Sequence, residues 1–207
     1  IRLTRREVIV TNENILIKRA VKGDNTAFET LMEKYMGVIY NIALRMAASR
    51  DDADDMTQEI MLKIFRSIAS FKGSSKFSTW IYRVAVNTCL DELKKKKNKT
   101  VLSLDKEFED DDGTSQIELK DDSPLPEAVA EQRELKDMVA AAITHLSDEH
   151  RAVIVLRDIR GMSYSEIADI MKCGDGTVKS RISRARAQLK TILEKEYNFD
   201  GTYFKKQ

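Results

Sequence analysis

The sequence predicts an all-α protein of two small helical domains joined by an acidic linker. Apolar residues recur every three or four positions through most of its 207 residues, which is the spacing of amphipathic helices. Only two prolines interrupt the chain. The net charge is just +1, yet residues 105–122 are strongly acidic and residues 172–195 strongly basic. This separation of charge predicts a basic binding surface and an acidic tether.

The first half of the chain is expected to form one domain, residues 13–98. Its four helices cover residues 13–21, 26–48, 53–70 and 78–97. Gly23 interrupts the pattern after the first helix. Asp51 or Asp52 can cap the third helix, because a side-chain oxygen there accepts a hydrogen bond from a free backbone N–H group. Ser78 opens the fourth helix.

The second half is expected to begin with the linker, residues 99–126, which is acidic and has no sustained apolar period. A second domain follows over 127–193, and 194–207 form a tail. Pro126 stands where helices often start, and Ser147 can cap the next helix. The helices of this domain cover 127–146 and 148–159, followed by two more within 163–190.

The stretch 163–190 has the pattern of a helix-turn-helix. Ser163 and Glu166 form a capping box that starts its first helix, and Gly174 ends that helix where a left-handed residue is wanted. The expected buried stripe of the second helix is Val178, Ile182, Ala185 and Leu189. The candidate DNA contacts on this helix are Thr177, Lys179, Ser180, Ser183, Arg184 and Lys190. Arginine and lysine reach phosphates and base edges in a major groove, while a solvated basic face is the alternative.

An acidic face is predicted on the third helix, opposite its apolar stripe. Its members are Asp54, Asp55, Gln58 and Glu59. One interpretation is a charged solvent face whose first-turn acids favour the helix dipole. The other is a surface that docks a partner.

Aromatic and basic side chains occur together in the loop 71–77 and on one side of the fourth helix. The candidate residues are Phe71, Lys72, Lys76, Phe77, Trp80, Arg83, Asn87, Lys94 and Lys95. Proteins bind single-stranded nucleic acid in this way, because bases stack on aromatic rings while cations neutralise the phosphates. The alternative is that both phenylalanines are buried and Trp80 anchors the core.

The remaining composition argues against an enzyme. Cys89 and Cys173 are too few for a disulfide framework, and His145 and His150 lack the spacing of metal ligands, so we expect neither a metal nor a cofactor. There is no glycine-rich phosphate loop and no paired nucleophile and base. No run reaches the ~20 apolar residues of a membrane span, and we expect a cytoplasmic protein.

Three blocks of sequence together resemble the sigma-70 family, specifically the extracytoplasmic-function (ECF) sigma factors. They are 53–59 (ADDMTQE), 77–87 (FSTWIYRVAVN) and 176–181 (GTVKSR). The resemblance implies a sigma region 2-like bundle over 13–98 and a sigma region 4-like helix-turn-helix over 127–193. It further implies that the chain binds core RNA polymerase and promoter DNA and initiates transcription without catalysing a bond change.

The resemblance also implies roles for the candidate residues. The acidic face would bind core polymerase, the 71–77 loop would hold a flipped base, and Asn87 would contact the non-template strand at the −10 element. The helix beginning near Thr177 would read the −35 element. A membrane-tethered anti-sigma factor is the expected regulator, and the chain itself is expected to be a monomer when free and not to insert into a membrane. A dimeric helix-turn-helix repressor and a pure interaction protein are the alternative classes.

Overall fold

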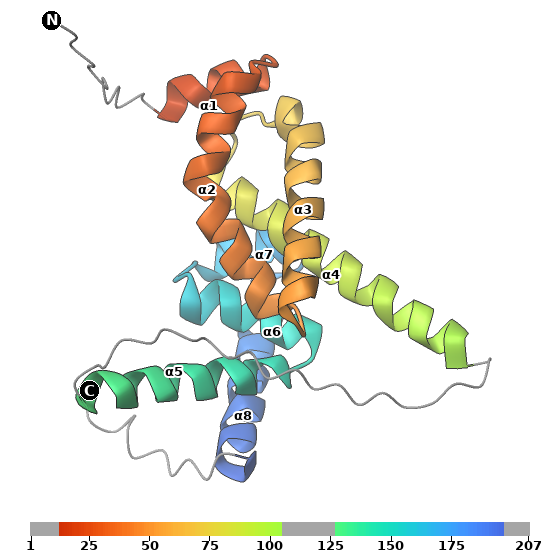
Figure 1. Ribbon diagram of the computed structural model, residues 1–207, viewed down its shortest axis with the longest axis vertical. Helices are drawn as coiled ribbons and strands as arrows, with labels where there is room; N and C mark the ends of the chain where they lie inside the picture. Colours follow the sequence, from red (N-terminus) through yellow and green to blue (C-terminus); the bar gives the residue numbers. More distant parts are fainter. Residues whose placement is uncertain (1–12, 105–126, 197–207) are drawn as a thin grey trace, which may run out of the picture.

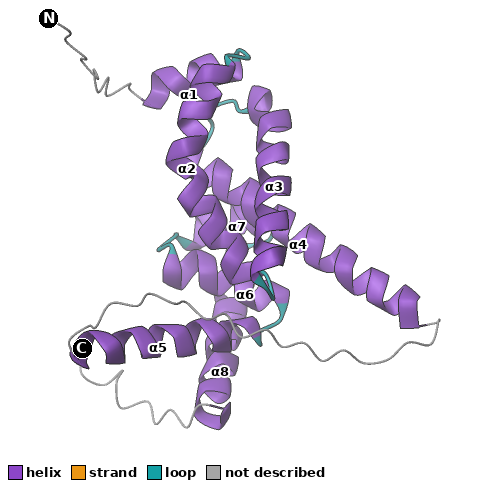
Figure 2. Ribbon diagram, viewed as in Figure 1, coloured by secondary structure: helices purple, strands orange, loops and turns teal. Residues whose placement is uncertain are grey.

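The computed structural model describes residues 13–104 and 127–196, and within these ranges every regular element is helical (Figures 1 and 2). The all-α prediction is therefore confirmed. The expected linker residues 105–126 and tail residues 197–207 lie outside the described ranges. The elements are α1 (Glu13–Val21), α2 (Asn25–Met46), α3 (Arg50–Ser67), η1 (Ile68–Ser70), α4 (Phe77–Leu104), α5 (Glu127–Thr144), α6 (Asp148–Ile154), η2 (Val155–Ile159), α7 (Tyr164–Met171) and α8 (Asp175–Glu196).

The first four helices pack around the apolar stripes that their spacing predicts. In Figure 1, α2 and α3 stand side by side, and α4 crosses behind them and extends to one side. The inward residues of these helices are almost fully buried and include Leu31, Ile39, Ile42, Met56, Ile60, Ile64, Ile81 and Val86. Burial of this apolar surface is the main source of stability for the bundle.

Several helix ends differ from the sequence-based prediction, and α8, for example, runs to Glu196, into the expected tail. Ser49 caps α3, because its hydroxyl accepts a hydrogen bond from the N–H of Asp52 at 3.1 Å. Asp51 and Asp52, predicted as caps, lie instead in the first turn, where negative charge favours the helix dipole. α4 continues to Leu104, into the stretch expected as linker. Its lysines and leucines are good helix formers, and no glycine or proline stops the helix there.

In the second half, the helix expected over 148–159 changes its winding. α6 ends at Ile154 and continues as the wider π turn η2, in which the N–H of Arg160 bonds to the carbonyl of Val155, five residues earlier, at 3.1 Å. Gly161 follows with a φ of +69°, a conformation that favours glycine. Such turns often occur at functional positions. The two arginines near this turn have different partners, because Arg157 donates to the carbonyl of Met162 and Arg160 to that of Val38.

The predicted capping box of α7 is present in full. The Ser163 hydroxyl accepts a hydrogen bond from the N–H of Glu166, whose carboxylate accepts one from the N–H of Ser163. The left-handed residue that ends α7 is Lys172, with a φ of +51°, so its assignment to Gly174 was wrong. A helix often ends with one residue in the left-handed conformation. Because α7 ends at Met171, that residue is Lys172, and Gly174 comes two residues too late.

The two halves pack against each other. α7 lies against α4, while α5 and α6 contact α2. Buried side chains from Leu16 to Leu93 and from Ile143 to Ala185 form one continuous apolar cluster. The two helical units predicted from the sequence therefore share a core in this structure.

Removal of the Ser163 hydroxyl tests the capping box. We expect Ser163→Ala to lower the free energy of unfolding by about 1 kcal/mol in chemical denaturation, because a free N–H of α7 loses its acceptor. The matched control is Thr191→Ala, whose exposed hydroxyl bonds back to Ala187 within α8 and caps nothing. The bonds from Ser163 lower the pKa of Glu166. The carboxylate therefore stabilises the fold above its ordinary pKa, and this contribution is lost as the pH falls through the lowered value. An equal loss of unfolding free energy in Ser163→Ala and Thr191→Ala would contradict the prediction about the capping box.

Candidate functional site

The face of α8 proposed for DNA is exposed along its whole length. Thr177, Lys179, Ser180, Ser183, Arg184 and Lys190 are all exposed. Val178, Ile182 and Ala185 are buried on the opposite side, and Leu189 is half-buried. The predicted division of this helix into a packed stripe and a free polar face is confirmed. A straight helix with its basic side uncovered has the shape required to enter a major groove.

A polar cleft of about 620 Å³ lies beside this face. Its walls come from the end of α4, the start of α6 and the start of α8, and its lining residues include Lys97, Ser147, Thr177, Ser180 and Arg184. Arg181 also lines it and forms an ion pair with Glu149 at 2.9 Å. Arg181 was not among the predicted contacts. Its position among the basic residues at the start of this helix could have indicated Arg181 from the sequence.

Tyr164, the first residue of α7, lies beside cations of η2 and of the start of α8. The Arg157 guanidinium stacks over its ring at 4.6 Å from the centroid, and the Lys179 ammonium lies 5.7 Å from the same centroid. Further along α8, Arg186 forms an ion pair with Asp158 of η2, which raises the pKa of Arg186. These contacts help to fix α8 against η2 and α7, and they engage Lys179, one of the candidate DNA contacts.

The loop 71–77 and the start of α4 form an aromatic cluster. Phe77 is only 5% exposed, with its ring 5.6 Å from Trp80 and 5.5 Å from Tyr35, centroid to centroid. Phe71 is half-buried and contacts both Phe77 and Trp80. Phe77 therefore packs in the core, which is the alternative that the sequence left open for it. Phe71 and Trp80 keep part of their surface accessible, and Lys72 and Lys76 are exposed beside them.

On α4, Trp80, Arg83 and Asn87 follow one another along one side and are half-buried. The Arg83 Nε atom is buried and has no hydrogen-bond partner within the described residues. A buried donor without an acceptor costs free energy, so this guanidinium is not fully satisfied by the described residues.

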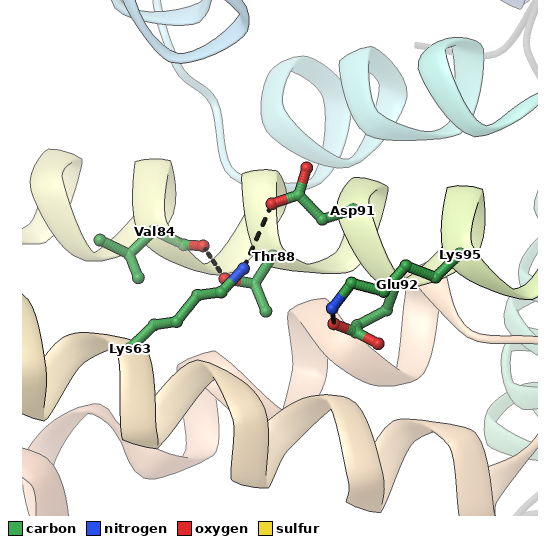
Figure 3. Close-up of polar contacts among 6 residues, drawn as sticks. All are labelled: Lys63, Val84, Thr88, Asp91, Glu92 and Lys95. Atoms are coloured by element: carbon green, nitrogen blue, oxygen red, sulfur yellow. Dashed lines mark hydrogen bonds and ion pairs between the residues drawn. The ribbon is translucent and has the colours of Figure 1, made fainter.

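The lysines at the end of α4 are engaged with carboxylates. Figure 3 shows Lys95 bonded to Glu92 at 2.7 Å and Lys63 of α3 bonded to Asp91 at 3.2 Å. Lys96 pairs with Asp52. Ion pairs this exposed contribute little to stability, so phosphates could replace the carboxylates at small cost. Lys94 is exposed on the same helix.

The acidic face of α3 is accessible and has apolar neighbours. Asp54, Asp55 and Gln58 are exposed and Glu59 is half-buried. Leu62, 47% exposed, follows Gln58 and Glu59 by one helical turn, and Phe65 is 53% exposed. Exposed apolar side chains beside charges are typical of protein interfaces. Leu62 and Phe65 were missed from the sequence, although their positions off the Met56–Ile60–Ile64 stripe could have indicated them.

The candidate residues thus form three separate surfaces, on α3, on α4 with its preceding loop, and on α8. Among the described residues no group of histidine, cysteine and carboxylate side chains is arranged to hold a metal ion. None of the helices in those ranges is long and apolar enough to cross a membrane.

The comparisons with known proteins assign both helical units to the sigma-70 family. The family model for Sigma-70 region 2 matches residues 31–99, and that for Sigma-70, region 4, matches residues 136–189. The ECF RNA polymerase sigma-E factor of Haemophilus influenzae is 37% identical over 187 residues, covering 88% of this chain and 95% of the relative. The ECF RNA polymerase sigma factor SigW of Bacillus subtilis is 37% identical over 178 residues, covering 86% and 94%.

The chain belongs to the ECF RNA polymerase sigma factors. Its role is in the initiation of transcription, and it is not an enzyme. The fold is also similar to that of the sigma factor RpoE from Bartonella quintana, solved in complex with the anti-sigma factor NepR. That similarity has a TM-score of 0.63 at 24% identity and covers 81% of this chain and 97% of the other.

Proposed function

We propose that the three surfaces divide the work of an initiation factor. The acidic face of α3 binds core RNA polymerase, the loop 71–77 and α4 capture the opened −10 element, and α8 reads the −35 duplex. The observation that carries this proposal is the exposed polar row on α8 opposite a buried apolar stripe. A row of this kind suits duplex DNA, and membership of the ECF sigma factors supports the assignment of the other two surfaces.

Core polymerase binding is assigned to Asp54, Asp55, Gln58 and Glu59, with Leu62 and Phe65 extending the surface. Carboxylates steer a basic partner and set the register, while exposed apolar side chains supply the buried centre of an interface. The partner segment is therefore expected to be basic with an apolar stripe.

Capture of −10 bases is assigned to the half-buried side of α4, with phosphates held by Lys72, Lys76, Lys94 and Lys95. Phe71 and Trp80 offer ring surface to an unstacked base, and Phe77 holds their cluster in place. Melting would draw its free energy from captured bases, at about 1–3 kcal/mol for each stacked base.

Asn87→Ala tests this assignment. We expect open-complex formation to fall about tenfold while affinity for core polymerase is unchanged, because an amide that reads one base is worth about 1–3 kcal/mol. Permanganate reactivity of unpaired thymines measures the open complex. The matched control is Asn41→Ala, an exposed amide on α2 that bonds to the carbonyl of Gly37. Melting by Asn87→Ala at the wild-type level would remove this face from the mechanism.

Arg184→Ala tests the assignment of α8. We expect about a tenfold loss of affinity for a promoter duplex, because a base-reading arginine contributes about 1–3 kcal/mol. If Arg184 contacts a phosphate instead, the slope of affinity against salt concentration falls by about one. Filter binding over a salt series separates the two cases. Lys195→Ala, an equally exposed cation at the far end of α8, is the control, and equal losses in both variants would contradict a specific contact.

Regulation by an anti-sigma factor is proposed as well. The structurally similar RpoE was solved with its anti-sigma factor bound, which supports the same kind of partner for this chain. We propose further that the partner is tethered to a membrane and that the sigma factor works in the cytoplasm. Co-purification of the chain with a membrane fraction, lost when the partner gene is deleted, would test this.

The proposed function as a whole is tested with core RNA polymerase. The purified chain should co-elute with core enzyme on a sizing column and should direct transcripts from a defined start on genomic DNA. A chain that binds duplex DNA as a dimer and ignores polymerase would instead be the helix-turn-helix repressor.

A further inference from the structure

We propose that Arg45 and Arg160 form a binding site for a phosphate group where α2, α4 and η2 meet. Arg45 is the basic residue in the last turn of α2, and Arg160 directly follows η2. The inference goes beyond the proposed function, because none of the three surfaces assigned to polymerase and promoter includes either arginine.

The Arg160 side chain lies between α2 and α4. Its guanidinium donates to the carbonyl of Val38 in α2 at 3.3 Å. The centre of the Tyr82 ring in α4 is 6.0 Å from the same guanidinium. The Nε atom of Arg160 is buried and has no hydrogen-bond partner among the described residues. Arg160 is therefore held on two sides, while one of its charged donors lacks an acceptor in that part of the chain.

Arg45 lies on the same side of α2 as Val38, because seven residues make almost two helical turns. Its side chain is half-buried. Burial lowers the pKa of Arg45, and the nearby charge of Arg160 lowers this pKa further. The two positive charges are therefore close enough to repel each other. A cation in the last turn favours the helix dipole, but the dipole does not account for a second arginine beside it.

No carboxylate neutralises this pair of arginines within the described ranges. Neither Arg45 nor Arg160 forms an ion pair there, although Asp158 lies only two residues before Arg160. The Asp158 carboxylate is already paired with Arg186 of α8. Like charges that are half-buried without a counter-ion cost free energy. An anion beside them would remove the repulsion and accept from the unfilled donor.

A phosphate group suits this pair of cations in both geometry and charge. A guanidinium presents its N–H donors in a plane that matches two phosphate oxygens. A phosphate monoester carries a charge of about −1.5 to −2 at pH 7, which balances two arginines. Inorganic phosphate and the terminal phosphate of a nucleotide offer the same oxygens, so both belong to the class of ligand that we propose.

Calorimetric titration of the whole chain with inorganic phosphate tests the site, with ionic strength held constant by sodium chloride. We expect Arg45→Gln and Arg160→Gln each to weaken phosphate binding about tenfold, because each removes one charged partner of the anion. The matched control is Arg66→Gln, which removes the same charge at an exposed position on α3 and should bind like the wild type. No binding by the wild type, or equal losses in all three variants, would overturn the proposal. A loss only in Arg184→Gln would place the anion on α8 and would also overturn it.

Thermal unfolding distinguishes a loss of the site from a loss of the fold. Without phosphate, the Tm of Arg45→Gln should equal or exceed that of the wild type, because the substitution removes a repulsion. Phosphate at about ten times its Kd should raise the Tm of the wild type by about 3–6 °C and that of Arg45→Gln by less than about 1 °C. A lower Tm of Arg45→Gln without phosphate would mean that the two charges do not conflict. An equal rise in both chains would place the phosphate elsewhere, and either result would overturn the proposal.

Titrations with ADP and with adenosine identify the source of the phosphate. Tighter binding of ADP than of inorganic phosphate would assign the site to a nucleotide, and equal binding would assign it to free phosphate. Both results support a phosphate site. Binding of adenosine as tight as that of ADP would show that the phosphate is not recognised, which would contradict the proposal.

Discussion

Asp55→Lys is expected to lower affinity for core RNA polymerase at least hundredfold. Asp55 is exposed on α3 beside Asp54, Gln58 and Glu59, so a lysine there removes an attraction and adds a repulsion toward a basic partner. Close charge pairs at interfaces have coupling energies of about 1.5–7 kcal/mol, and losing one accounts for a change of this size. Co-elution with core enzyme on a sizing column, followed by a titration with labelled chain, measures the loss.

The control for this substitution is Asp169→Lys, the same change of net charge at an exposed position on α7. It should leave polymerase binding within about twofold, because screening at physiological salt limits charge effects to about 8 Å. Equal losses in the two variants would mean that only total charge matters. The acidic face would then be a solvated surface, the interpretation that the sequence left open.

Arg151→Ala is expected to lower the free energy of unfolding by about 3 kcal/mol or more, the largest stability effect among the changes considered. The Arg151 side chain is 7% exposed and donates to the carbonyls of Met46, Thr144 and Leu146. Removing it leaves buried acceptors without donors, and each such group costs about 1–3 kcal/mol. Denaturant titration followed by circular dichroism measures the difference.

Arg151→Lys provides a graded comparison. A lysine keeps the charge but cannot reach several carbonyls with one planar group, so we expect an intermediate loss. Arg66→Ala, at an exposed position on α3, should change stability by less than about 0.5 kcal/mol. If Arg151→Ala were no worse than Arg66→Ala, the buried guanidinium would have no structural role.

Local patterns in the sequence predicted much of this protein. The stripe of Val178, Ile182 and Ala185 correctly separated the buried and exposed sides of α8. The capping box at Ser163 correctly placed the start of α7. These predictions succeed because helical periodicity and capping depend on residues within one or two turns of each other.

Other features needed the packed structure. Periodicity alone left open whether Phe77 would meet a base or the core, and the ring of Tyr35 in α2 decides that it packs. The spacing of apolar residues over 148–159 did not indicate the π turn η2, because one extra residue in a turn changes that spacing only slightly. Leu62 and Phe65 lie off the buried stripe of α3, but only the packing of their neighbours shows that both side chains stay exposed.

The sequence by itself determined that the chain is all-α, that it has two helical units, and that its second unit contains a helix-turn-helix whose second helix has an exposed basic side. Only the tertiary structure decided that the two units close on each other. The polar contacts that join them link residues 51 to 122 positions apart, from Lys97 with Asp148 to Arg160 with Val38. Contacts over such separations depend on the shapes and charges of two complete surfaces, which no local spacing encodes.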